Sequence, residues 1–120
     1  MGLDNQKAAK QLIQVHCFRS SISRSYYAAY CAVTGELAGK FTFGYGGNNP
    51  SHTDLPNLIL HNLTTLPVHE RHEVRKAVAR LWKARVDADY APSIHIDSDV
   101  ALKVLHELSR VFTLLGIADD

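Results

Sequence analysis

The segment from Ser23 to Val33 places the strongest constraint on the fold. It reads SRSYYAAYCAV, and every residue after Ser25 is apolar, small or aromatic. A surface helix keeps a polar face, whereas a helix that is apolar all round is surrounded by other elements. The segment therefore predicts one central helix wrapped by others, with Arg24 at its polar entrance.

Apolar residues recur at helical spacing along most of the remaining chain, and no alternation typical of strands is present. Pro67 suits a first helical turn, Asp97 a capping position and Gly116 a helix end. A long loop with four glycines, 39–53, separates the two halves. We predict an all-α fold in one domain, 1–120, with helices at about 4–15, 17 or 20–38, 65–90 and 97–115 and a short helical piece at 55–63. Whether the first two helices are continuous stays open.

Composition excludes several classes of protein. The chain is 46% hydrophobic and 21% charged, which is ordinary for a soluble globular protein. It has no apolar run near the roughly 20 residues of a membrane span, and its start lacks the layout of a secretory signal. We expect a cytoplasmic protein with no membrane partner. The net charge of +1 argues against global capture of nucleic acid but leaves a local patch open.

The two cysteines, Cys17 and Cys31, are predicted to be free. They are 14 positions apart along what reads as one helix. At the rise of a helix they would be separated by roughly 21 Å, too far for a disulfide. We expect both thiols to be buried and inert.

The predicted 65–90 helix carries the most informative charge. Arg85 falls within the apolar stripe next to Leu81, and a charge there needs a partner. Asp89, one turn on, could form a structural ion pair with it. Alternatively, the guanidinium is held at a cleft and aimed at phosphate. The same helix holds a basic set with one tryptophan, which is either a solvated face or a nucleic-acid footprint: Arg71, Arg75, Lys76, Arg80, Trp82, Lys83 and Arg85.

The seven histidines do not predict a metal site. His69 and His72 are three apart on the predicted helix, but the zinc protease motif H-E-x-x-H places its histidines four apart. No third ligand is identifiable. We predict no metal and no cofactor.

Two segments together resemble a HEPN domain, the small helical module of prokaryotic toxin–antitoxin and nucleotidyltransferase-associated proteins. The first is Ser-Arg-x-Tyr-Tyr-Ala-x-Tyr at 23–30. The second is Arg-x-x-Ala-Asp-Tyr at 85–90, before an amphipathic last helix, with His52 ahead of the third long helix. The resemblance spans about 20–117. It implies an up-and-down bundle of four to five helices, commonly a homodimer.

The resemblance also implies two kinds of function. Active members cut RNA without a metal through an R-x4–6-H motif brought together across the dimer. Others act beside a small nucleotidyltransferase and bind nucleotide or RNA. In this chain no arginine has a histidine five to seven positions later; after Arg85 those positions are Tyr90, Ala91 and Pro92, and His95 comes too late.

Our leading expectation is therefore a non-catalytic HEPN-like dimer that binds a nucleotidyltransferase-type partner, a nucleotide or RNA. The alternative is an RNA-cleaving toxin with an altered site, in which Arg85 stabilises phosphate and Tyr90, His95 or His52 assists proton transfer. A purely structural interaction protein comes third. The candidate nucleotide- or RNA-binding residues are Arg24, Tyr27, His52, Arg85, Asp89 and Tyr90.

Overall fold

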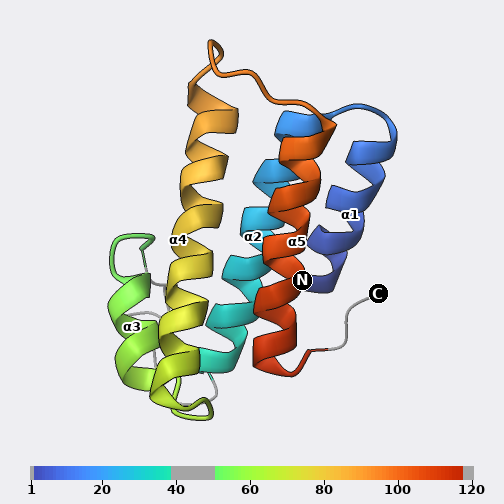
Figure 1. Cartoon of the computed structure of the whole chain (residues 1–120). Coiled ribbons are helices and arrows are strands. Elements are labelled where there is room, and N and C mark those ends of the chain that lie inside the picture. The colour runs from blue at the N-terminus through green and yellow to red at the C-terminus, as the bar shows by residue number, and fades with distance from the viewer. Residues whose placement is uncertain (1, 39–50, 118–120) are drawn as a thin grey trace.

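The protein is an all-α bundle, as predicted. The computed structural model describes residues 2–38 and 51–117, and within these ranges it contains helices and no strand. In Figure 1 the long helices lie side by side, and the short helix α3 packs at the lower end of α4. The helices are α1 (Gly2–Gln14), α2 (Phe18–Ala38), α3 (Leu55–Asn62), α4 (Val68–Tyr90) and α5 (Ser98–Leu115).

Helix α2 is the centre of the bundle and packs against each of the other four helices. Its inner face buries Ile22, Tyr26, Ala29, Val33 and Leu37, and a narrow stripe on the opposite side, which includes Arg24, stays exposed. Close packing against α1 depends on small side chains. A Cβ added at Gly2 would lie 3.2 Å from the Ala28 carbonyl oxygen. The apolar segment thus acts as the predicted central helix.

The first two helices are separate. The break lies at Val15–Cys17, where His16 adopts a left-handed backbone with φ of 62°. The His16 amide donates to the Ile13 carbonyl at 3.1 Å, and the Cys17 amide donates to the Leu12 carbonyl at 2.8 Å. This pair of bonds is the Schellman ending of a helix. This turn reverses the direction of the chain, so that α2 runs back along α1.

The predicted ends of the other helices hold to within a few residues. Asp97 caps α5, its side chain accepting a hydrogen bond from the Val100 amide, and Gly116 follows that helix in a left-handed conformation. Pro67 lies at the N-cap of α4, one residue before the helix begins. Most of the predicted loop, 39–50, lies outside the described residues.

The aliphatic core lies where α2, α4 and α5 meet. The predicted stripe of α4 contributes buried Val74, Ala77, Val78, Leu81 and Ala88, and α5 contributes residues such as Leu108 and Phe112. Among the helices of the described residues, none is long and apolar enough to cross a bilayer.

The expectation about the cysteines is partly wrong. Both thiols are free, but Cys17 is exposed and Cys31 is only partly buried. Cys17 is exposed because it lies in the turn between α1 and α2 and not inside one continuous helix.

Candidate functional site

Arg85 lies on the side of α4 that faces α2, and its side chain is only 14% exposed. Its guanidinium carbon is 5.4 Å from the ring centre of Tyr27, 5.2 Å from that of Trp82 and 5.5 Å from that of Tyr90. Cations are attracted to aromatic faces at such distances. The rings therefore hold a largely dehydrated positive charge between the two helices.

The charge of Arg85 is balanced by Asp89. The Arg85 Nε atom lies 2.9 Å from Asp89 Oδ2, and the Ser23 hydroxyl donates to the same carboxylate oxygen at 3.4 Å. The Nε–H bond is not aligned with the carboxylate, so this contact is an ion pair without a hydrogen bond. Nε is therefore a buried donor without a hydrogen-bond partner among the described residues.

His52 extends the aromatic surroundings of the site. Its ring stacks on Trp82 with centroids 4.2 Å apart, and its Nδ1 shares a hydrogen bond with the Tyr26 hydroxyl. Burial, and secondly the positive charge of Arg85, lower the pKa of His52, which favours the neutral imidazole. Burial, followed by the neighbouring Tyr30 and Tyr27, raises the pKa of Tyr26.

A surface hollow of about 480 Å³ opens beside this cluster. Arg24, Tyr27 and Asp89 line it, together with Leu12, Ser20 and Ser23. Arg24 is exposed and donates to the side chain of Asn5 at 3.4 Å. A ligand in the hollow could therefore reach the exposed Arg24, and Tyr27 connects the hollow to Arg85.

The structure brings the six predicted residues together in one region. Tyr27, Asp89 and Tyr90 contact Arg85, and Trp82 links Arg85 to His52. Arg24 joins them through the hollow. Tyr90 is 69% exposed, so its ring is available to a ligand. His95, considered for the nuclease alternative, is turned towards Asp97 at 3.4 Å.

Sequence reasoning missed three members of the cluster. Trp82 was assigned to the basic face of the helix, although its spacing of three from Arg85 places both on one face. Tyr26 was predicted to lie in the core, but its hydrogen bond to His52 links residues 26 positions apart. Ser23 and Asp89 are 66 positions apart in the sequence and lie on different helices, so no local signal predicts their contact.

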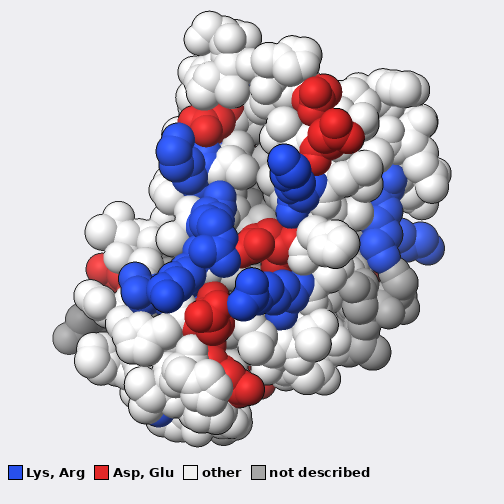
Figure 2. Space-filling view, in the orientation of Figure 1, with Lys and Arg blue, Asp and Glu red and all other residues white. Residues whose placement is uncertain are grey.

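Three of the other basic residues of α4 have partners within the bundle. Arg71 donates to the carbonyls of Leu60 and Leu66, so it fastens α3 to α4. Arg80 pairs with Glu107 of α5, and Lys83 pairs with Asp87 at 3.1 Å. Figure 2 shows positive and negative side chains interleaved over this side of the molecule. This charge compensation fits a solvated face better than a nucleic-acid footprint.

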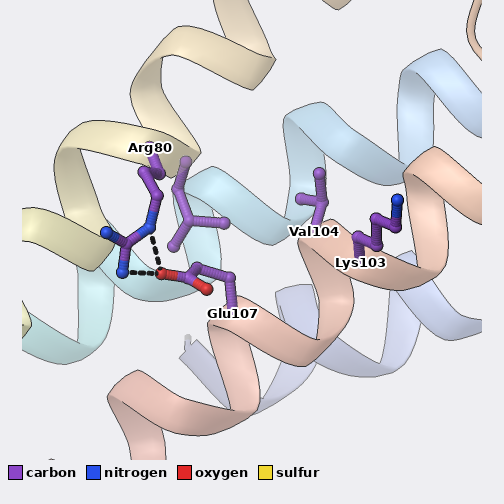
Figure 3. Close-up of a pocket in the computed structure, with 5 residues that line it drawn as sticks. Arg80, Lys103, Val104 and Glu107 are labelled. Atoms are coloured by element: carbon purple, nitrogen blue, oxygen red, sulfur yellow. Dashed lines mark hydrogen bonds and ion pairs between the residues drawn. The ribbon is translucent and has the colours of Figure 1, made fainter.

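A small groove lies beside the Arg80–Glu107 pair, between α4 and α5. It measures about 190 Å³ and has Leu81 and Val104 at its base. In Figure 3 the carboxylate of Glu107 points to the Arg80 guanidinium, whereas Lys103 points away. Arg80 and Glu107 already neutralise each other at this groove, so we place the candidate site at Arg85. Nowhere in 2–38 and 51–117 do three or more His, Cys, Asp or Glu side chains gather as metal ligands would.

Comparison with known families gives one result. The HEPN domain family matches residues 1–118, which is essentially the whole chain. The chain therefore belongs to the HEPN domain family, as its two sequence segments predicted. No curated protein and no solved structure shows significant similarity to it.

Proposed function

We propose that this HEPN domain protein is a non-catalytic module that binds the phosphate of a nucleotide or RNA between Arg85 and Arg24. One observation carries the proposal. The guanidinium of Arg85 is held in place by three rings, yet its buried Nε has no hydrogen-bond partner among the described residues. Buried polar groups are normally hydrogen-bonded, so a buried donor without a partner suits a ligand.

Phosphate fits these donors chemically. A guanidinium presents a planar fork that matches two phosphate oxygens, and such charge-assisted bonds are about twice as strong as neutral ones. Arg24 adds a second positive charge at the rim of the hollow. The carboxylate of Asp89 neutralises the positive charge of Arg85, so a bound phosphate competes with this carboxylate for Arg85.

Membership of the family supports two further parts of the proposal. The protein forms a two-fold homodimer through helical faces, and it acts as the helical companion of a small nucleotidyltransferase. Light scattering at high micromolar concentration tests the dimer, and a monomer would contradict it. Co-purification with a nucleotidyltransferase encoded beside it would support the companion role.

One observation favours RNA cleavage as a second candidate function. His52 and Arg85 pack on the same tryptophan, and burial together with the charge of Arg85 lowers the pKa of His52, which favours the neutral form that a proton acceptor needs. Against it, Nδ1 of His52 already shares a hydrogen bond with Tyr26, and the R-x4–6-H spacing is absent. Metal-free cleavage of RNA that is lost in His52→Gln would establish this alternative.

The decisive experiment compares two arginines of α4. A fluorescent single-stranded RNA and ATP are each titrated into the wild type, Arg85→Ala and the matched control Arg80→Ala, whose side chain is 53% exposed. Arg85→Ala should weaken binding about tenfold or more, as expected when hydrogen bonds to a charged group are lost. Arg80→Ala should change it little, and binding should fall steeply with salt. Equal losses, or a wild type that binds neither probe, would contradict the proposal.

A further inference from the structure

Three long helices of this protein end in two different ways. Helices α1 and α5 each close with a left-handed residue, His16 or Gly116, whose neighbours satisfy the last carbonyls through backbone bonds. Helix α4 has no such ending. Its C-cap, Ala91, has φ of −122° and ψ of 76°, and the cap amide donates only to the Asp87 carbonyl.

The carbonyls at the end of α4 are satisfied instead by Arg19, from the first turn of α2. Its Nη1 lies 3.3 Å from the carbonyl oxygen of Asp87, 3.0 Å from that of Ala88 and 3.2 Å from that of Ala91. Its Nη2 donates to the carbonyls of Pro92, at 3.3 Å, and Ile94. Helix C-termini carry unpaired carbonyls and a partial negative charge, so a guanidinium fits there both by hydrogen bonding and by charge.

We propose that Arg19 is a positioning residue of the candidate site, fixing the end of α4 so that Asp89 and Tyr90 meet Arg85. Asp89 and Tyr90 lie within the turn whose carbonyls Arg19 holds. One turn beyond Arg19 on α2, Ser23 contacts Asp89 and Arg24 lines the hollow. Arg19 therefore ties together the two helices that border the hollow, and its role in binding rests on the proposed function.

The chemistry of arginine is specific to this role. Five carbonyls surround the two terminal nitrogens, which a planar guanidinium can reach with a fixed fork of donors. A lysine ammonium keeps the charge but presents its donors from one atom. Arg19→Lys should therefore restore only part of what Arg19→Met removes.

Hydrogen exchange tests the positioning without any ligand. In Arg19→Met the amides of residues 87–91, 93 and 94 should exchange about tenfold faster or more, the change expected from lost bonds to a charged donor, while the middle of α4 stays protected. Arg19→Lys should give a smaller increase, and the control Arg80→Met none. If exchange became faster uniformly over all helices, Arg19 would have only a general structural role. If exchange at the end of α4 did not become faster, Arg19 would not hold that end at all. Either result overturns the proposal.

Binding of the same RNA probe supplies the second readout, at a temperature where exchange shows the bundle intact. Arg19→Met should bind about tenfold more weakly than the wild type, with Arg19→Lys between them. Unchanged affinity in Arg19→Met would overturn the positioning role even if the end of α4 frays. If the wild type does not bind the probe, the proposed function fails, and the exchange result alone decides whether Arg19 positions Asp89 and Tyr90.

Discussion

Helix α4 presents two faces that use arginine in opposite ways. On its charged face, towards solvent and α5, Arg80 is 53% exposed and pairs with Glu107, and Lys83 pairs with Asp87. On its aromatic face, towards α2, Arg85 is 14% exposed and surrounded by the rings of Tyr27, Trp82 and Tyr90. Arg80 and Arg85 are only five positions apart in the sequence.

The difference shows that surroundings, and not the number of basic residues, make a candidate binding site. Water screens the ion pairs of the charged face, and exposed pairs typically contribute less than about 1 kcal/mol. On the aromatic face the low-dielectric surroundings strengthen every electrostatic interaction. For the same reason, the buried Nε of Arg85 lowers stability as long as it has no hydrogen-bond partner. The following experiments test whether the two faces differ as this contrast requires.

The largest effect should come from removing the centre of the aromatic face. Tyr26 is 1% exposed and its ring contacts Trp82, Tyr27 and His52. Tyr26→Ala should lower the free energy of unfolding by about 3–5 kcal/mol, as other buried aromatic truncations do. Urea unfolding measures it. The control Tyr90→Ala, at 69% exposure, should cost less than about 1 kcal/mol. A cost that small for Tyr26→Ala as well would show that the ring of Tyr26 is not a core element.

The next effect concerns the ion pair on the aromatic face. A double-mutant cycle of Arg85→Ala and Asp89→Ala should give a coupling of about 1–2 kcal/mol, between the values of exposed and buried pairs. The cycle is measured by chemical unfolding at low salt. Should the coupling be near zero, Asp89 would not neutralise Arg85, and its competition with phosphate would have to be abandoned.

The pH dependence of stability should also separate the two faces. The pKa of His52 is lower in the folded state than its ordinary value of about 6.5, so below that pH the unfolded chain binds more protons. The free energy of unfolding should therefore fall as the pH drops below about 6.5, until the folded-state pKa is reached. Unfolding at about pH 7.5 and about pH 5.5 measures this. His52→Gln should lose part of the dependence, whereas His106→Gln, at an exposed site, should keep it.

The smallest effect should come from the charged face. A cycle of Arg80→Ala and Glu107→Ala should give a coupling of about 0.2–1 kcal/mol that shrinks in high salt. A coupling as large as that of Arg85 with Asp89 would erase the contrast between the two faces of α4.

Much of the architecture could be predicted from sequence because it depends on local patterns. The stripe of α5 and its ends at Asp97 and Gly116 follow from helical spacing and capping chemistry, and both ends were found as expected. The break at His16 could not be predicted, because no glycine or proline marks it and residues other than glycine seldom adopt a left-handed backbone. The exposure of Cys17 followed from that break, so one unmarked turn explains both the open question and the wrong expectation.

Two of the three tyrosines of α2 show the limit of the helical wheel. Tyr26 and Tyr30 are one turn apart, which predicts that both are mostly buried, but only Tyr26 is enclosed, whereas Tyr30 is partly exposed. Distance along the helix does not decide this, because Val33 and Leu37 lie further along α2 and are fully buried. At about 100° per residue, Tyr30 is turned about 40° from Tyr26 towards the partly buried Tyr27 and Cys31, so it lies at the edge of the buried face. A wheel gives the direction of a side chain and not where the cover by neighbouring helices stops.

By itself, the sequence determined the all-α class, the central place of α2, membership of the HEPN domain family and the set of candidate residues. These depend on the spacing and chemistry of residues that are neighbours in the chain. Only the tertiary structure decided that Ser23 touches Asp89, that His52 stacks on Trp82, and that Arg19 caps α4. Such contacts join residues tens of positions apart, and they exist only once packing of the apolar faces has fixed the helices side by side.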